Sequence, residues 1–297
     1  MSTNSSIQRN AGNLKQEGKH VIHAAATSPL MEKLIRLGYV VRGLVYGVIG
    51  LLAFQVAVGS GGKLTDQQGA IAAVGSTPVG KILLYVMLLG LVGYALWGLI
   101  RAVVDPLHEG HDAKGIVQRV GYLVSGISYG LLALATYGLI TAKAPAATSG
   151  AQAAQTQQTT ASILTQPWGP WVVALAAAIV IGVGLSHIYT AFRRKFNPQF
   201  QLALRTGTAR KWIERLGRFG TAARGVVFTL IGVFLFQAAV QHNASRAQGI
   251  DGVLTALLHQ PFGPWLLAVV AAGLIAFGIY SAMIKRVVKA EMRAQRL

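Results

Sequence analysis

The residues that most resemble a catalytic pair are a serine between two glycines and a distant histidine. Residues 126–130 read GISYG, which fits the G-x-S-x-G pattern around the nucleophile of many serine hydrolases, and His187 could act as the base for Ser128. In those enzymes the serine stands on a sharp turn between a strand and a helix. Here the motif falls inside an apolar run, and no such run holds an acidic residue to orient His187. We therefore expect no catalytic residues, with an intramembrane serine hydrolase as the third of three hypotheses.

A short polar segment between two apolar runs carries side chains that can bind a divalent metal. A solvated loop is the simpler interpretation, and we expect no metal site. Cysteine is absent, which excludes thiolate-based metal sites, and the sequence has no H-E-x-x-H, phosphate-binding or dinucleotide-binding motif, so we expect no cofactor. The candidate metal ligands are Asp105, His108, Glu109, His111 and Asp112.

Two arginines stand at the borders of apolar runs, and an aromatic residue follows each of them by four positions. Arg42 precedes Tyr46, and Arg224 precedes Phe228. Tyr129 holds the corresponding place in a third run. A charge inside a membrane is costly and often marks a pathway, but an arginine at the margin can also extend to lipid phosphates. We favour interface anchoring for the arginines and packing for the rings, and we keep open a central passage lined by the rings.

The composition predicts the elements that carry these residues. Of the 297 residues, 53% are hydrophobic and 12% are charged, which is about half the charged share of a typical globular protein. A helix needs about 20 apolar residues to cross a hydrocarbon core about 30 Å thick. Six stretches qualify, and only helices and closed barrels satisfy backbone polar groups in lipid. The sequence therefore predicts an all-α integral membrane helical bundle, with spans at about 43–62, 79–100, 120–142, 168–192, 225–242 and 262–284.

The positive residues predict the orientation of these spans. Twenty-three of the 27 Lys and Arg residues fall in the N-terminal segment, in the connections 101–119 and 193–224, or in the C-terminal tail. Only four fall in the other loops. Because cytoplasmic loops carry the excess of Lys and Arg, we expect both the N- and C-termini to be cytoplasmic.

One pattern of residues recurs before each odd-numbered span, and a second pattern opens each even-numbered span. Such periodicity indicates three copies of a two-helix unit. Each copy enters and leaves on the same side, so the copies are parallel repeats with pseudo-threefold symmetry. The markers of the odd spans are Arg36, Gly38 and Gly43, then Arg119, Gly121 and Gly126, then Arg218, Gly220 and Gly225. The markers of the even spans are Pro78, Pro167 and Pro261, which we place in a first helical turn.

The three even spans share a further pair of residues, whereas the three outer loops differ from one another. Each even span has a glycine followed seven residues later by an aromatic residue: Gly90 and Trp97, Gly182 and Tyr189, Gly273 and Tyr280. The first and third outer loops end in a short apolar helix. In the second copy, the Ala-, Gln- and Thr-rich tract 144–162 replaces much of that helix, and we interpret the tract as a flexible linker.

With these markers, the chain resembles the bacterial membrane family called domain of unknown function 1206, in which two-helix units occur in tandem. The resemblance covers nearly the whole chain after about residue 30. It implies a multi-pass protein of the bacterial plasma (inner) membrane and supplies no mechanism. The divisions are a flexible tail 1–29, repeats at 30–105, 106–193 and 210–286, a linker 194–209 and a basic tail 287–297.

The basic character of the chain indicates its partners. Residues 210–219 place apolar side chains opposite basic ones, which predicts an interfacial helix on anionic cytoplasmic lipid. No nucleic-acid-binding element is evident. We therefore expect a non-enzymatic protein that acts through membrane lipids, a membrane-protein partner or a homo-oligomer. The alternative is a channel or carrier for a small solute along the pseudo-threefold axis.

Overall fold

The computed structural model describes residues 29–104, 113–141, 150–193 and 208–283, and its regular elements there are all helices. Six helices are long and apolar enough to cross a membrane, as predicted. They are α2 (Pro29–Ala57), α4 (Gly80–Val104), α5 (Ala113–Ile140), α7 (Gly169–Phe192), α9 (Thr208–Val240) and α11 (Gly263–Met283). The shorter helices are α3 (Gln67–Gly75), α6 (Ala151–Leu164), the 3-10 turn η1 (Ala244–Arg246) and α10 (Ile250–Leu258).

Several predicted segments lie outside the described residues. These are nearly all of the tail 1–29, the loop with the candidate metal ligands, most of the linker 194–209 and the tail 287–297. Residues 210–219, which we predicted to form an interfacial helix, are the first part of the longer helix α9, and their place at the lipid interface stays a prediction. α2 ends at Ala57, earlier than predicted, and three glycines with positive φ follow it.

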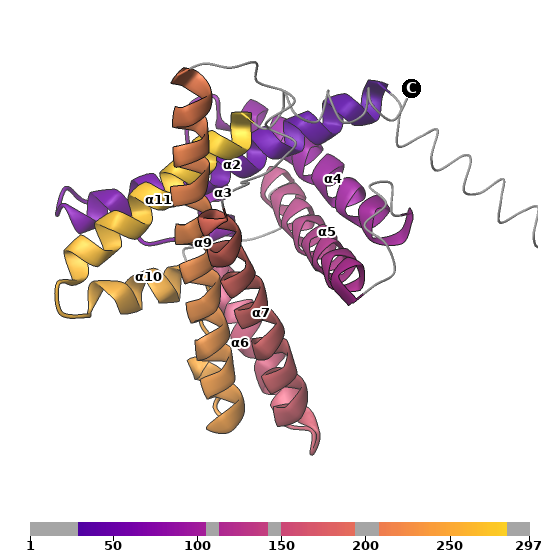
Figure 1. Ribbon diagram of the computed structural model, residues 1–297, viewed down its shortest axis with the longest axis vertical. Helices are drawn as coiled ribbons and strands as arrows, with labels where there is room; N and C mark the ends of the chain where they lie inside the picture. Colours follow the sequence, from indigo (N-terminus) through magenta and orange to yellow (C-terminus); the bar gives the residue numbers. More distant parts are fainter. Residues whose placement is uncertain (1–28, 105–112, 142–149, 194–207, 284–297) are drawn as a thin grey trace, which may run out of the picture.

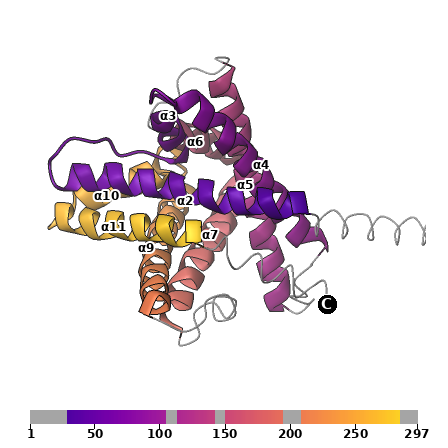
Figure 2. The same cartoon turned by 90° about the horizontal axis from the view of Figure 1, so that it is seen from above.

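The six long helices pack in pairs that join neighbouring repeats. Each second helix of a repeat packs along the first helix of the next, so α4 lies beside α5, α7 beside α9, and α11 beside α2 (Figure 1). The view from above shows the same three pairs (Figure 2). These three interfaces are equivalent under the threefold repeat, with the third one closing the circle from repeat 3 back to repeat 1.

A marker glycine explains how closely each pair approaches. A Cβ atom added at Gly225 would lie 2.8 Å from the carbonyl oxygen of Gly184, and one added at Gly126 would lie 3.1 Å from that of Ala95. Gly43 meets Gly278 in the same way. The three partner residues each stand seventeen positions after the proline of their repeat. Small residues allow helix backbones to approach this closely in membranes. The predicted pseudo-threefold symmetry is therefore present in the contacts.

The even-span markers form a turn before the helix. Gly80 N–H donates to the Thr77 carbonyl at 2.8 Å, and the turns before α7 and α11 have the same bond. Pro78 therefore occupies the second position of a four-residue turn, which its fixed φ favours, and the predicted place in a first helical turn is wrong. Since this turn joins α6 to α7 in repeat 2 as well, residues 151–164 are the equivalent of α3 and α10. The flexible-linker interpretation is wrong for that part of the tract.

The two helices of a repeat pack together in repeats 1 and 3 but not in repeat 2. α2 packs on α4, and α9 on α11, whereas α5 and α7 share no extended interface within the described residues. In repeat 1 a Cβ atom at Gly38 would lie 2.7 Å from the Gly90 carbonyl oxygen. At Gly121, the equivalent position of repeat 2, nothing described lies within 4 Å.

In repeat 2 the glycine and aromatic pair stands three residues further from its proline than in repeats 1 and 3, so the pairs align only approximately there. Counting from the prolines, Ile179 is the equivalent of Gly90 and Gly273, and Gly182 is the equivalent of Gly93. Gly93 packs on Leu34 of α2, whereas a Cβ atom added at Gly182 would meet no described atom within 4 Å. Leaving the hairpin unpacked exposes side chains: Val124 is 52% exposed, whereas its equivalent Val41 is 2% exposed.

Candidate functional site

Two arginines from different repeats converge on one aromatic ring. The guanidinium carbon of Arg42, on α2, lies 4.8 Å from the centroid of the Phe277 ring, and that of Arg224, on α9, lies 5.1 Å from the same centroid. Both side chains therefore contact a ring on a neighbouring helix, and the interface anchoring that we expected for them stays a prediction. Such cation–aromatic contacts contribute about 0.5–2 kcal/mol each, depending on desolvation.

Aromatic residues surround the two cations. Arg42 donates a hydrogen bond to the Tyr94 hydroxyl and also lies over the Tyr94 ring. Arg224 lies over the rings of Tyr46 and Phe228, at 5.4 and 4.8 Å from their centroids. Tyr129 packs on Tyr94 with their centroids 4.5 Å apart. We name this group the arginine–aromatic cluster; it comprises Arg42, Tyr46, Tyr94, Tyr129, Arg224, Phe228 and Phe277.

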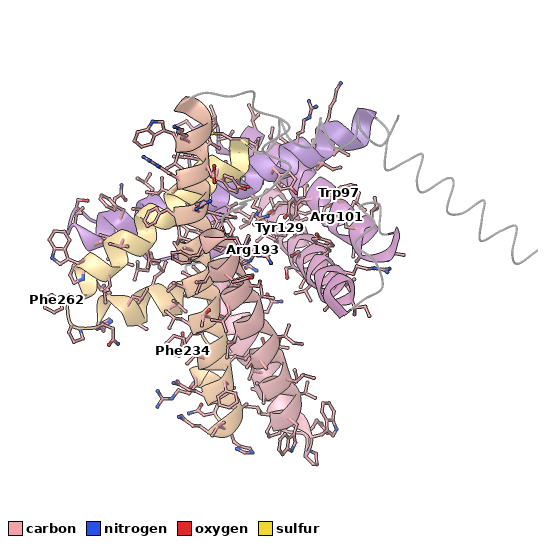
Figure 3. All side chains as sticks on the ribbon, viewed as in Figure 1. Trp97, Arg101, Tyr129, Arg193, Phe234 and Phe262 are labelled. Carbon is pink, nitrogen blue, oxygen red and sulfur yellow. The ribbon has the colours of Figure 1, made fainter. Side chains whose placement is uncertain are left out.

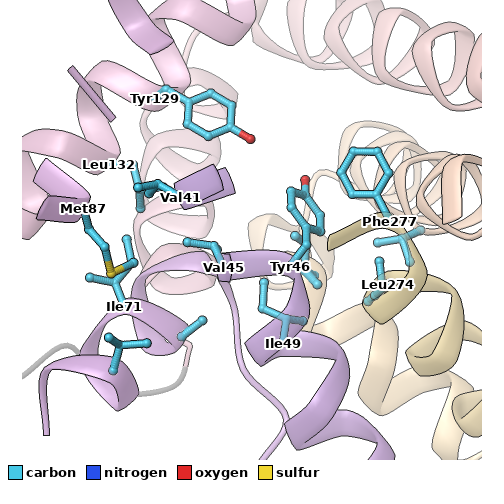
Figure 4. Close-up of a cluster of buried hydrophobic side chains, with 14 of the residues drawn as sticks. Val41, Val45, Tyr46, Ile49, Ile71, Met87, Tyr129, Leu132, Leu274 and Phe277 are labelled. Atoms are coloured by element: carbon cyan, nitrogen blue, oxygen red, sulfur yellow. The ribbon is translucent and has the colours of Figure 1, made fainter. Parts of the chain in front are cut away.

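Three donors in the cluster are buried without a partner among the described residues. Tyr129 is 7% exposed, and its hydroxyl has no hydrogen-bond partner within the described part of the chain. The hydroxyl points toward the side where Tyr46 and Phe277 lie (Figure 4). Leaving a buried hydroxyl unpaired costs about 1–3 kcal/mol. The Nε atoms of Arg42 and Arg224 are the other two buried donors with no partner in the described ranges.

The cluster has positive charge but no acidic partner among the described residues. Neither arginine has a carboxylate within 4 Å there, and the nearest described ion pair on α9 joins Arg218 to Glu214. Because both guanidinium carbons lie about 5 Å from one ring centroid, they are at most about 10 Å apart. With an effective dielectric constant of about 20, two like charges at this distance repel each other by roughly 2 kcal/mol.

The structure does not join the candidate nucleophile to the candidate base. The Ser128 hydroxyl donates to the Val124 carbonyl of its own helix at 2.8 Å. His187, on α7, packs edge-on against Phe228 with their centroids 6.1 Å apart. No hydrogen bond connects Ser128 with His187 in the described residues. His187 therefore borders the arginine–aromatic cluster.

Two carboxylates lie at the end of the molecule that carries α3, α6 and α10. Asp66 is fully buried and accepts bonds from the backbone N–H groups of Gly69, at the start of α3, and of Gln152, at the start of α6. Burial, and next the charge of Asp66, raise the pKa of the Asp251 carboxyl. Gln67 links this end to the cluster, because its side-chain amide donates to the Tyr46 hydroxyl at 3.3 Å.

The arginine marker of repeat 2 contacts the end of α4. Arg119 donates to the carbonyls of Ala102 and Val103, which are among the last residues of α4 and lack partners within that helix. On α4, Arg101 bonds the Tyr122 hydroxyl at 2.7 Å and lies near the Trp97 ring (Figure 3). These contacts hold the α4–α5 pair together beside Tyr129.

Comparison with known proteins agrees with this triple arrangement. The family described as Domain of Unknown Function (DUF1206) matches three successive segments, at residues 37–105, 120–194 and 219–284. The chain belongs to the DUF1206 family. This DUF1206 protein is also 30% identical over 257 residues to "Uncharacterized protein YxxB" of Bacillus subtilis, an alignment that covers 86% of this chain and 91% of that protein. No solved structure matches. The chain is thus a multi-pass membrane protein of a bacterial family whose function is unknown.

The structure brings together the six residues that we took as candidates for an interface or a pathway, and it adds two. Arg42, Tyr46, Tyr129, Arg224 and Phe228 form the cluster, and His187 borders it. Sequence reasoning missed Tyr94 and Phe277. A signal existed, because each stands sixteen residues after the proline of its repeat. Repeat 2 has Val183 at that position, so the aromatic ring is absent from one copy of three.

Proposed function

We propose that this DUF1206 protein is a non-enzymatic binding protein whose arginine–aromatic cluster holds an anionic group. The observation that supports this proposal is the convergence of Arg42 and Arg224 on Phe277 without a described carboxylate. A bound anion relieves the repulsion between the two cations. It also accepts a hydrogen bond from the Tyr129 hydroxyl, which has no partner in the part of the chain that the structure describes. Each hydrogen bond to a charged group contributes about 1.5–3 kcal/mol.

The location that we propose follows from the charge distribution and the family. The protein resides in the bacterial plasma membrane with both termini in the cytoplasm. Arg42 then lies about 13 Å along the helix from Lys33, at the cytoplasmic end of its span, given a rise of about 1.5 Å per residue. The cluster is reached from the cytoplasmic half of the membrane. We also propose that the protein binds a membrane-protein partner or a second copy of the chain.

Phosphate binding tests the cluster directly. Full-length protein in detergent, stripped of lipid, is titrated with inorganic phosphate by calorimetry. We expect binding by the wild type and by Arg215→Gln, which changes an exposed arginine on α9. We expect loss of binding in Arg42→Gln and in Arg224→Gln, and partial binding in Arg42→Lys, which keeps the charge. Equal binding by all variants would contradict the proposal, and circular dichroism checks that each variant is folded.

A second candidate is a passage along the pseudo-threefold axis. It is favoured by the hydrogen bond from Gln67 to Tyr46, which continues the polar residues from the Asp66 end toward the cluster. In proteoliposomes this candidate predicts solute flux that falls on Tyr46→Phe or Tyr129→Phe substitution. Phosphate binding without any flux would leave the binding function and remove the passage.

A further inference from the structure

We propose that the occupant of the cluster is a phospholipid of net negative charge, which enters between α5 and α7. This inference rests on the proposed function and adds the identity and the route of the ligand. The α5–α7 seam is defined as the hairpin interface that repeat 2 leaves unpacked. Its residues are Val120, Gly121 and Val124 on α5, and Ile179, Gly182 and Val183 on α7.

The first argument is that the seam faces an apolar environment. Val120 and Val124 are 43% and 52% exposed, and Ile179 on α7 is 46% exposed. The counterparts of Val124 and Ile179 in repeats 1 and 3 are buried: Val41 and Ala223 are 2% and 7% exposed, and Gly90 and Gly273 are buried as well. Val41 packs against Gly90. α7 is the least buried of the six long helices. Since hydrocarbon chains are as apolar as these side chains, acyl chains can cover the seam.

The second argument is that the seam leads to the cluster. α5 contributes Tyr129 to the cluster, and α7 places His187 against Phe228, although the two helices share no extended interface. Repeat 2 also has smaller side chains at two positions that contribute to the cluster in repeats 1 and 3. Ser125 stands where repeats 1 and 3 have Arg42 and Arg224, and Val183 stands where they have Tyr94 and Phe277. The cluster is therefore least enclosed on the side of the seam.

The third argument is charge. The two guanidinium groups match a phosphate, for which arginine provides planar paired donors. Among the described residues the cluster has no carboxylate that could hold the ammonium group of a zwitterionic lipid. A headgroup without a cation, such as that of phosphatidylglycerol, therefore fits better than phosphatidylcholine.

Filling the seam without disturbing the rest of the protein provides the test. Gly121→Leu and Gly182→Leu add side chains where nothing described lies within 4 Å. Gly47→Leu is the matched control, because a Cβ atom added at Gly47 on α2 also meets no described atom within 4 Å. Native mass spectrometry of protein purified in mild detergent counts the bound phospholipids. We expect the wild type and Gly47→Leu to retain phospholipid, and both seam variants to lose it.

A competition experiment separates this inference from the proposed function. After delipidation, we expect phosphatidylglycerol micelles to abolish phosphate binding by the wild type and by Gly47→Leu, and phosphatidylcholine micelles to leave it intact. In the seam variants we expect phosphate to bind whether or not phosphatidylglycerol is present. Phospholipid retained by the seam variants, or no competition in the wild type, overturns the lipid inference while phosphate binding still supports the anion site. Absence of phosphate binding in every protein overturns both.

Discussion

The same marker glycine should respond differently to alanine in repeats 1 and 2. In Gly38→Ala the new Cβ atom would lie 2.7 Å from the Gly90 carbonyl oxygen and 2.7 Å from the Tyr94 Cβ atom. Both atoms belong to α4 and neither is the end of a flexible side chain, so α2 and α4 must separate to make room. Overpacking of this kind costs about 1–3 kcal/mol. The intrinsic preference of a helix for alanine over glycine offsets about 1 kcal/mol of that cost.

Gly121→Ala adds the same atom where nothing described lies within 4 Å. Only the helix preference then acts, and the variant should be as stable as the wild type or more stable by up to about 1 kcal/mol. The two variants should differ by about 1–3 kcal/mol. Since 1 kcal/mol corresponds to about 2–4 °C in chains of 150–250 residues, the difference should be several degrees.

Thermal unfolding in one detergent, followed by circular dichroism, measures this difference. Gly47→Ala serves as a second variant with an open Cβ position. Equal destabilisation by Gly38→Ala and Gly121→Ala would refute the reasoning, because it would mean that α5 and α7 close on each other as the helices of repeat 1 do. The phospholipid route would then be closed as well.

Three further substitutions test the cluster and the carboxylate end. Tyr94→Phe removes the acceptor of the Arg42 hydrogen bond and should lower the free energy of unfolding by about 1.5–3 kcal/mol; an unchanged denaturant midpoint would contradict it. Asp66→Ala removes the cap of α3 and its bond to α6, and should cost about 1–2 kcal/mol in the same assay, where no loss would count against the double cap. Because burial and then Asp66 raise the pKa of Asp251, that carboxyl ionises more readily in the unfolded chain. Wild-type stability therefore falls as pH rises from the ordinary Asp pKa of about 4 in the unfolded chain toward the raised pKa in the folded protein. Asp251→Asn should raise the Tm at pH 7 but not below pH about 4. An equal gain at both pH values would contradict this explanation.

The sequence was sufficient to predict the elements and their symmetry. Long apolar runs admit only helices in lipid, and recurrence of the marker residues predicts three equivalent units. Pairing between repeats was not predictable from the runs themselves. The pairing depends on the close approach of two helix backbones at Gly225 and Gly184. That contact can be recognised only when the residues of the three repeats are numbered from their prolines.

The polar tract of α6 misled the sequence interpretation for a physical reason. Glutamine and threonine suggest a solvated linker, but α6 lies at the end of the bundle, where polar side chains meet water. Its N-terminus is held by the Asp66 carboxylate from repeat 1. Hydrogen bonding across repeats therefore replaces the apolar packing that Ile71 supplies in α3.

Repeat 2 differs from the others at the positions that matter for an anion site. A third arginine at Ser125 would place three cations around one centre, so three repulsive pairs would replace one. At roughly 2 kcal/mol for each pair, the repulsion within the unoccupied cluster would rise from about 2 to about 6 kcal/mol. A third aromatic ring at Val183 would fill the side of the cluster that adjoins the seam. Ser125 and Val183 therefore limit the cluster to two arginines and leave it accessible from the α5–α7 seam. Both belong to repeat 2, whose helices share no extended interface in the described residues.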